Sequence, residues 1–400
     1  MTHPRIGIWL IGARGGVAST VLVGLTALQK GLVGEVGLVS RLPEFEKLDL
    51  APWGSFVAGG HEIRALNLVE EARRLVTVSH AIDERLVEQC RGELEAIDAR
   101  VRLGTAVNTG PTIEGLSDRS VPRDPSPRET IARIQAHLRE FREANRLEHV
   151  VVVNVASTEP PCAVELPARW TELEAQLDGP VGRALPASTL YAIAALDLGC
   201  SYLNFTPSLG SSPAAIADLA LARGSRMMGC DGKTGETLLK SVLAPMFRQR
   251  NLQVMSWVGH NIFGNMDGVV LNDPANKQTK VASKDHLLRQ ILGYKPQTLV
   301  SIEYIESLGD WKTAWDHIHF KGFLGTPMTM QFIWQGCDSL LAAPLVLDLL
   351  RFTELAWRRG ETGTLRFLAS FFKSPYGVDE QDFTRQFQML EAWANGGEKP

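Results

Sequence analysis

The chain has 400 residues, of which 44% are hydrophobic and 22% are charged, and its formal net charge is −4. This composition is typical of a globular protein long enough for two domains, and it excludes disordered and fibrous classes. The slightly acidic balance argues against a nucleic-acid-binding protein, whose domain would normally be basic. An anionic small-molecule substrate would therefore need a local cluster of positive charge.

The five cysteines are scattered along the chain and show no CxxC spacing. That pattern is typical of a reducing compartment and predicts neither a disulfide framework nor a zinc site. The apolar runs at residues 6–11 and 340–350 are too short for a signal peptide or a membrane span. The sequence therefore predicts a cytoplasmic protein with no nucleic-acid or membrane partner.

The first half of the chain predicts alternating strands and helices. It opens with a buried strand at 6–11, a glycine loop at 12–16, a helix at 19–30 and a second strand at 36–39. Later elements are expected as helices at 84–101, 128–145 and 186–198, and as strands at 150–155 and 201–205. The alternation indicates an α/β fold with a doubly wound parallel sheet.

Beyond residue 225 the pattern changes. Strands are expected at 252–258, 299–305 and 314–323, with few long helices between them, which predicts an antiparallel sheet with helices on one face. A strong helix at 338–359 is expected to return to the first domain. We therefore expect a first domain made of residues 1–224 and 336–400, and a second made of residues 225–335.

The first candidate motif is the glycine loop at 12–16, G-A-R-G-G, between a strand and a helix. The position suits a dinucleotide pyrophosphate at a helix N-terminus, although the spacing is not G-x-G-x-x-G and a plain tight turn is the alternative. The acidic ribose ligand is expected about 20 residues further on, where this chain has Ser40 and Arg41. That departure leaves open NADP, or a ribose ligand from elsewhere, such as Glu62 after a predicted turn at Gly59 and Gly60.

The second candidate motif is the segment 229–237, G-C-D-G-K-T-G-E-T, which precedes a predicted helix at 238–248. A P-loop is excluded because Met227 stands where its first glycine is required. The hydroxyls of Thr234 and Thr237, together with the free N–H groups of the helix, would still suit a phosphate. A threonine that simply caps the helix is the alternative.

The third candidate motif is the segment 261–268, N-I-F-G-N-M-D-G, followed by Lys277, Lys280 and Lys284. Neighbouring ammonium groups lower each other's pKa, and a neutral lysine can act as a general base. The alternative is a solvated, lysine-rich turn. His317 and His319 would share one face of a strand, but no third metal ligand is evident, and ordinary partly exposed histidines are the preferred interpretation.

Taken together, these segments resemble the inositol-1-phosphate (inositol-3-phosphate) synthase family, and its archaeal and bacterial branch most. The resemblance runs from the glycine loop to about Gly377. The family motifs and the segments similar to them are G-D-D-x-K-(S/T)-G-x-T at 229–237, N-H-L-G-N-N-D-G at 261–268, S-K-E-I-S-K at 279–284, V-G-D-S-K at 308–312, C-E-D-S-L-L-A-x-P at 336–344 and W-L-K-A-P at 371–375.

The resemblance implies an NAD-binding Rossmann domain built from both chain ends. It also implies an inserted α+β domain, similar to the C-terminal domain of glyceraldehyde-3-phosphate dehydrogenase, for catalysis and tetramerisation. The implied protein is a homotetrameric isomerase of inositol and phospholipid biosynthesis. It would convert glucose 6-phosphate to myo-inositol 3-phosphate by oxidation at C5, aldol closure and reduction. An ammonium or divalent cation as electrophile is left open.

The resemblance also implies the site residues, each by its place in a matching segment. The expected catalytic residues are Lys280, Lys284, Lys312, Lys373, Asp231 and Asp338. The expected cofactor-binding residues are Gly12, Ala13, Arg14, Gly15, Gly16, Val17, Glu62, Ser157, Asp231 and Asp338. The expected phosphate-binding residues are Thr234, Gly235, Thr237, Asn265, Lys284 and Lys312. No metal ligand is assigned.

Three departures from the family pattern keep other functions open. Cys230 and Met266 replace an acid and an amide, and Glu236 stands where many members have glutamine. A glutamate beside a phosphate is unfavourable unless its side chain points away. The alternatives are a cyclase for another sugar phosphate, a two-domain NAD(P)-dependent dehydrogenase, and a non-catalytic NAD-binding scaffold, although a scaffold would have no need of the matching lysines.

Overall fold

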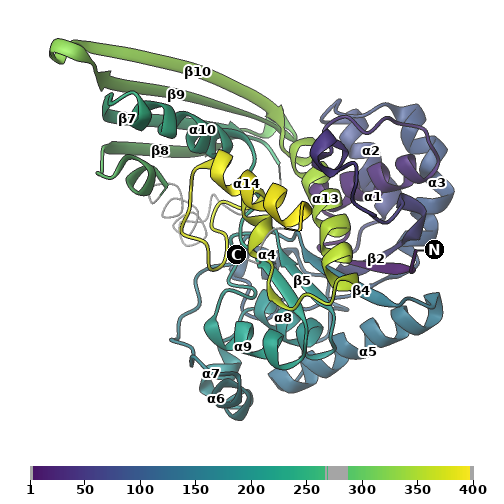
Figure 1. The fold of residues 1–400 in the computed structure, drawn as a ribbon. Helices are drawn as coiled ribbons and strands as arrows, with labels where there is room; N and C mark the ends of the chain where they lie inside the picture. Colours follow the sequence, from purple (N-terminus) through teal and green to yellow (C-terminus); the bar gives the residue numbers. More distant parts are fainter. Residues whose placement is uncertain (1–2, 266–267, 269–286, 397–400) are drawn as a thin grey trace.

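The computed structural model describes residues 3–265, 268 and 287–396. These residues form a seven-stranded sheet with helices on both faces, and a separate four-stranded sheet that extends away from it (Figure 1). No helix in these ranges is long and apolar enough to cross a membrane.

All neighbouring strands of the large sheet run parallel, in the order β11-β6-β5-β4-β1-β2-β3. The strands are β1 (Ile6–Ile11), β2 (Phe56–Glu62), β3 (Val101–Leu103), β4 (His149–Asn154), β5 (Ser201–Asn204), β6 (Arg226–Gly229) and β11 (Gly363–Thr364). From β3 to β6 this is the strand order of the Rossmann fold. The predicted doubly wound NAD-binding fold is confirmed.

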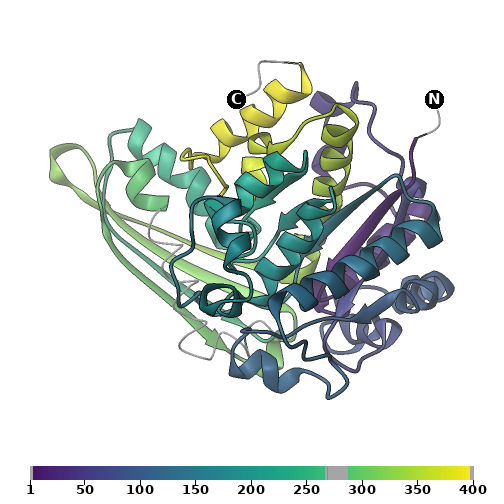
Figure 2. The same cartoon turned by 90° about the horizontal axis from the view of Figure 1, so that it is seen from below.

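The central strand β1 shows how the sheet is buried on both faces. Ile6, Ile8 and Leu10 pack into one core, and Trp9 and Ile11 pack into the other, because successive side chains of a strand point to opposite faces. The first core lies under α1 (Gly16–Gln29), α2 (Leu68–Thr77), α3 (Glu84–Asp98) and α13 (Asp338–Arg358). The second core lies mainly under α5 (Pro127–Asn145), α6 (Trp170–Ala175), α8 (Ala187–Asp197) and α9 (Ala214–Ala222), and Figure 2 shows α5 running along this face. The short helices α4 (Pro111–Leu116) and α7 (Pro180–Arg183) lie in connections.

The predicted strand at 36–39 is wrong. Val36 is fully exposed, and the chain reaches β2 through the short 3-10 turns η1 (Val39–Arg41), η2 (Pro43–Phe45) and η3 (Trp53–Ser55). The second strand, β2, contains Gly59 and Gly60, which the sequence suggested to be a turn. A Cβ on Gly60 would lie 2.3 Å from the Leu10 carbonyl oxygen, so glycine is required there by close packing within the sheet.

The smaller sheet has the order β10-β9-β7-β8 and is covered on one face by α10 (Gly235–Gln249). Its strands are β7 (Gln253–Phe263), β8 (Gln297–Tyr304), β9 (Trp311–Lys321) and β10 (Pro327–Cys337). The predicted antiparallel sheet is corrected to a mixed one, because β7 and β8 pair in parallel. The long connection between residues 263 and 297 permits that pairing, since parallel neighbours need a crossover. Strand β10 was not predicted.

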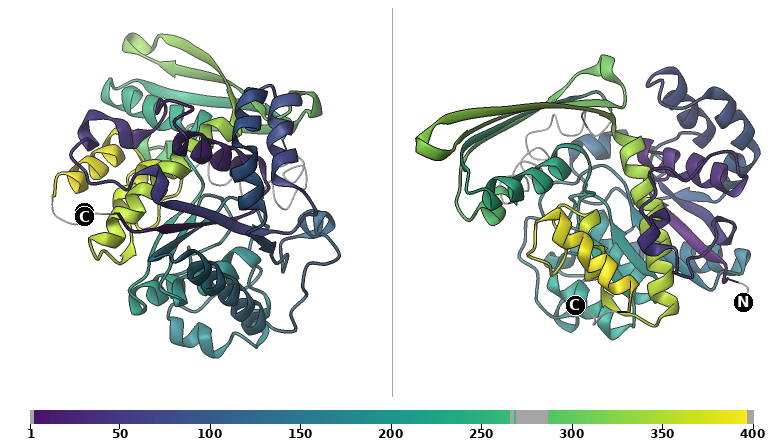
Figure 3. Two further views of the ribbon diagram at one scale, coloured as in Figure 1. Left: turned by 90° about the vertical axis from the view of Figure 1, so that its right-hand side faces the viewer. Right: turned by 45° about the horizontal axis from the view of Figure 1, so that its top comes forward.

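The end of the chain returns to the large sheet. Helix α13 begins at the residue that follows β10 and packs against α1, and α14 (Phe383–Ala394) packs on η6 (Arg366–Phe371) (Figure 3). The division into 1–224 with 336–400 and 225–335 remains a proposal. Since β6 pairs with β5 in the large sheet, we propose that the inserted domain begins after residue 229.

Candidate functional site

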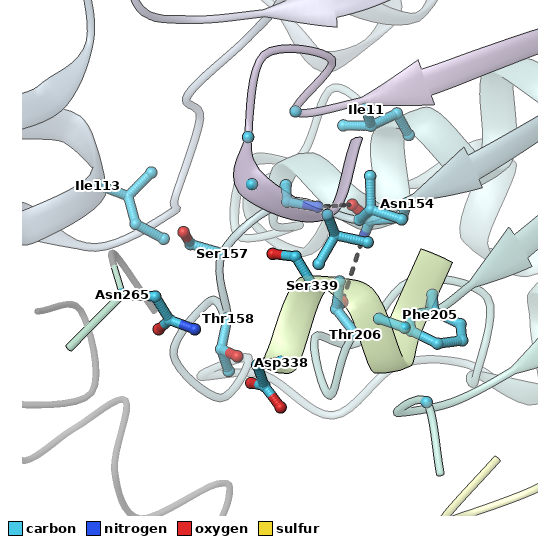
Figure 4. Close-up of a pocket in the computed structure, with 18 of the residues that line it drawn as sticks. Ile11, Ile113, Asn154, Ser157, Thr158, Phe205, Thr206, Asn265, Asp338 and Ser339 are labelled. Atoms are coloured by element: carbon cyan, nitrogen blue, oxygen red, sulfur yellow. Dashed lines mark hydrogen bonds between the residues drawn. The ribbon is translucent and has the colours of Figure 1, made fainter. Parts of the chain in front are cut away.

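A cavity of about 540 Å³ lies at the carboxyl ends of strands in the large sheet. It spans the point where the strand order reverses, between β1 and β4, which is where ligands bind in open α/β sheets. Figure 4 shows Ser157, Asn265 and Asp338 around one opening, although they come from three distant segments. The expected site residues that line the cavity are Gly12, Gly15, Gly16, Val17, Glu62, Ser157, Asp231, Thr234, Asn265, Asp338 and Lys373.

The glycine loop fits a dinucleotide pyrophosphate. Gly12 has φ +80°, and a Cβ on it would lie 2.9 Å from Ala156 Cα, so a larger residue would not fit. Helix α1 begins directly after Gly15, and no side chain caps it, so its first N–H groups can bind an anion. Two expected cofactor-binding residues lie outside the cavity wall: Ala13 is fully buried, and the Arg14 guanidinium pairs with Asp98 at 2.7 Å.

Glu62 lies at the end of β2, the position that the dinucleotide fingerprint requires for the ribose ligand. Its buried carboxylate accepts hydrogen bonds from the backbone N–H of Arg14 (2.9 Å) and of Ile63 (2.9 Å). Ser40 lies elsewhere, and its backbone N–H donates a hydrogen bond of 3.0 Å to the Asp348 carboxylate. The acid is therefore present at the end of the second strand, and the departure is one of spacing, because that strand comes later in the chain than the fingerprint expects.

Asp231 and Lys373 are brought together by backbone pairing of the segments 229–233 and 371–376. Cys230 N–H donates to the Ser374 carbonyl (2.9 Å), and Lys373 N–H donates to the Asp231 carbonyl (2.7 Å). In consequence Lys373 Nζ lies 2.8 Å from Asp231 Oδ1, and both side chains are largely buried in the cavity wall. Of the two expected catalytic lysines that the structure describes, Lys373 lines the cavity and Lys312 does not.

The other expected lysines are placed differently or not described. Lys280 and Lys284, with Lys277 and Met266, lie outside the described residues. Lys312 lies on β9, with Nζ 5.3 Å from the centre of the Phe263 ring, and is not in the cavity wall.

The segment 229–237 ends at a helix N-terminus that opens on the cavity. Thr234 is in the N-cap position of α10, yet its side chain makes no capping hydrogen bond. The N–H groups of the first turn and the Thr234 hydroxyl can therefore hold an anion. Gly235 and Thr237 are in that first turn, and neither lines the cavity.

The charge of Glu236 is directed away from this helix end. Its Oε1 lies 2.5 Å from Lys240 Nζ, and its Oε2 accepts a hydrogen bond of 2.8 Å from Asn261 Nδ2. All three side chains are buried under the smaller sheet. The glutamate that replaces the family's glutamine is thus neutralised within the protein, and it does not oppose a phosphate.

Sequence reasoning missed Asp310, which joins the two sheets at the cavity. Its carboxylate accepts from Ser339 N–H (2.9 Å), Cys337 Sγ (2.9 Å) and Asn265 Nδ2 (3.3 Å), so it holds the N-terminus of α13. Burial raises the pKa of the Asp310 carboxyl. The acid in the matched segment 308–312 was the available signal.

A buried lysine behind the cavity, Lys233, was also not assigned. Its Nζ contacts Gln386 Oε1 on α14 and lies 6.0 Å from the centre of the Phe383 ring. Burial, and then the positive charge of Lys373, lower the pKa of Lys233 to about 7. Its place in the matched segment 229–237 was the signal.

Glu159, in the connection after β4, is a second missed acid in the cavity wall. Its carboxylate accepts hydrogen bonds from the Ser188 hydroxyl and from the Ser188 N–H (2.9 Å), near the start of α8. Burial raises its pKa to about 7, although the Ser188 bonds act in the opposite direction. A polar run directly after a buried strand was the signal.

Glu159→Gln is expected to gain stability relative to the wild type as the pH rises. The folded protein keeps a proton on Glu159 up to about pH 7, whereas an unfolded glutamate loses it near pH 4.5. The wild type therefore loses up to about 1.4 kcal/mol for each pH unit between these values, and glutamine, which cannot ionise, loses nothing. Urea unfolding at pH 5, 6, 7 and 8 measures this, with the exposed Glu165→Gln as control. An equal difference at pH 5 and pH 8 would contradict it.

Among the described residues no group of three or more His, Cys, Asp or Glu side chains is placed to hold a metal ion. His317 and His319 do share a strand face. Across the sheet, His317 is opposite Gln331 and Val258, which are not metal ligands.

Comparisons with known proteins agree with this site. A model of the myo-inositol-1-phosphate synthase family matches residues 6–395. The inositol-3-phosphate synthase 1 of Bacteroides thetaiotaomicron is 32% identical over 414 aligned positions, covering 97% of this chain and 94% of the relative. The human inositol-3-phosphate synthase 1 is 29% identical, over 89% of this chain and 69% of its own length.

Solved structures show the same fold. An inositol-3-phosphate synthase from Caenorhabditis elegans superposes with a TM-score of 0.87 at 24% identity, covering 98% of this chain and 86% of the other. A myo-inositol-1-phosphate synthase-related protein from Thermotoga maritima superposes with a TM-score of 0.78 at 23% identity, covering 98% and 99%.

Proposed function

Because the chain belongs to the myo-inositol-1-phosphate synthase family, we propose that it is an NAD-dependent isomerase that converts D-glucose 6-phosphate to 1D-myo-inositol 3-phosphate. The observation that carries the proposal is one cavity in which the glycine loop, Glu62 and the Asp231–Lys373 pair meet. A cofactor site and an acid–base pair in one space are what a hidden oxidation followed by ring closure requires.

The residues around the glycine loop hold and orient the cofactor. The N–H groups at the start of α1 would hold the pyrophosphate, and Glu62 would hold the adenosine ribose. When bound, NAD supplies the hydride acceptor for C5 and returns the hydride after ring closure, so there is no net redox change.

Lys373 is the proton donor that the cavity wall provides. Its ammonium group has three N–H donors, and the contact with Asp231 orients it. The remaining donors can stabilise the alkoxide that forms at C1 during aldol closure. Asp338 lies at the first residue of α13 and lines the same space.

The start of α10 and Thr234 are proposed to bind the phosphate of the substrate. We assign Lys280 to removal of the C5 hydroxyl proton, and Lys284 and Lys312 to the phosphate. Those three assignments rest on the family resemblance.

The deciding experiment incubates the purified protein with glucose 6-phosphate and NAD+, and follows the product by phosphorus NMR and NADH by absorbance. Inositol phosphate without net NADH supports the isomerase. Accumulating NADH would show a dehydrogenase, and no product would remove glucose 6-phosphate as the substrate.

We further propose a homotetramer that uses the open face of the smaller sheet. Opposite the α10 side, the cross-strand register places Ile333, Trp315 and His260 in one row, and His260 stacks on Trp315. Ile333 is 71% exposed and Leu299, on β8, 54% exposed. An exposed row of apolar and aromatic side chains on a sheet suits packing against a second copy of the chain.

Ile333→Asp is expected to dissociate this assembly without unfolding the subunit. A carboxylate in the centre of an apolar contact would be buried without a partner, which costs several kcal/mol. Light scattering coupled to gel filtration measures the mass, and Val36→Asp, at a fully exposed site on the large domain, is the matched control. An unchanged mass for Ile333→Asp would place the interface elsewhere.

A further inference from the structure

The end of β2 carries a second charged group beside Glu62. Arg64 also lines the cavity. Its guanidinium makes a bidentate contact with the Glu62 carboxylate, in which Nε donates to Oε1 at 3.1 Å and Nη2 donates to Oε2 at 3.2 Å. Nη2 also donates to the Arg14 carbonyl at 3.0 Å. The arginine therefore lies between the glycine loop and the proposed ribose ligand.

We propose that Glu62 alone restricts this protein to NAD, and that Arg64 is a latent ligand for the 2′-phosphate of NADP. This inference rests on the proposed function, in which an NAD cofactor occupies the cavity.

The Glu62 carboxylate decides which nucleotide fits the site. In this fold the substituent at the ribose 2′ position meets the acid at the end of the second strand. Glu62 is fixed there by the N–H groups of Arg14, Ile63 and Arg64, so it cannot turn away from a 2′-phosphate. Two anions would then face each other in a buried site, which excludes NADP.

Arg64 supplies a binding edge for a phosphate. The Nε–Nη2 edge that binds Glu62 is the edge that pairs with two oxygens of a phosphate. In the wild type that edge is occupied by the carboxylate. Glutamine at position 62 can keep its acceptor oxygen in the Oε1 position, where the N–H groups of Ile63 and Arg64 donate, but it places an NH2 donor opposite Arg64 Nη2, so the two-point contact is broken. The uncompensated guanidinium would then bind the 2′-phosphate.

Arg64 differs from the other arginines nearby in the carboxylate that it contacts. The Arg14 guanidinium is paired with Asp98 at 2.7 Å, and Arg74, which also lines the cavity, lies 3.5 Å from Glu71. Each of these arginines has its own carboxylate, which Glu62→Gln does not remove. Arg64 is therefore the cation that the substitution releases.

The test is fluorescence titration of NADH and NADPH into the full-length wild type, Glu62→Gln, Arg64→Met and the double variant. The wild type should prefer NADH by about a hundredfold or more. Glu62→Gln should bind NADPH at least about tenfold more tightly than the wild type does, and the double variant should lose that gain. Arg64→Met should bind NADH within a few-fold of the wild type, because backbone N–H groups still hold Glu62; it also serves as the folding control.

If Glu62→Gln gains no NADPH affinity, or if the double variant keeps the gain, the inference is wrong while the proposed function stands. A wild type that binds neither nucleotide would overturn both.

Discussion

Lys373→Met should lower kcat about a thousandfold or more and leave NADH binding nearly unchanged. Methionine keeps the length of the side chain but removes every N–H donor, and loss of one donor to a developing oxyanion costs about 10² to 10³ in rate. Loss of proton transfer adds to that cost. NADH should still bind because the glycine loop and Glu62 come from other segments of the cavity wall.

Single-turnover assays and NADH titration measure the two effects separately. Lys321→Met, at an exposed position at the end of β9, is the matched control. Asp231→Asn should give a smaller loss, since Lys373 would keep its donors but lose the carboxylate that orients it. More than a tenth of wild-type activity in Lys373→Met would remove this lysine from the reaction.

Lys240→Met is expected to destabilise the fold by about 3 to 5 kcal/mol, because it withdraws the ammonium group from a buried carboxylate. Glu236 and Lys240 are both buried, and Glu236 Oε1 lies 2.5 Å from Lys240 Nζ. Asp316 Oδ1 lies 3.9 Å from the same ammonium group. Since Glu236 is in the first turn of α10, loss of its contact with the Lys240 ammonium group should also raise KM for the sugar phosphate.

Urea unfolding measures the loss, and Glu236→Gln/Lys240→Met is the diagnostic partner variant. The double variant removes Glu236 together with the cation, while Asp316 stays, so it should recover part of the stability. A double variant as unstable as Lys240→Met would show that Lys240 acts by packing and not by charge.

Segments with a strong hydrophobic period were predicted well from the sequence. Segments whose residues are chosen for packing against another strand were not. The helix at 338–359 and the strand at 6–11 were predicted almost to the residue. The glycines of β2 suggested a turn because their reason, the close approach to β1, lies in another strand. Strand β10 escaped prediction because it begins with a proline and most of its residues are exposed or half-buried.

The site was predictable in part, for the same physical reason. The glycine loop and Glu62 follow from local rules, provided that the second strand is correctly placed. The contact between Asp231 and Lys373 joins residues 142 positions apart, and only the family resemblance had assigned both residues to the site. Asp310 and Glu159 were missed because their partners, Ser339 and Ser188, are near in space and not in the local sequence.

The use of early and late segments in one sheet also sets when the complete cavity can exist. Helix α13 covers the core face that α1 leaves open, and Lys373 completes the cavity that Gly12 begins. At about 5 to 20 residues per second, translation reaches residue 373 about 20 to 75 s after it begins. The glycine loop is therefore made early and Lys373 late, so the complete cavity, with its acid–base pair, exists only after nearly the whole chain has been synthesised.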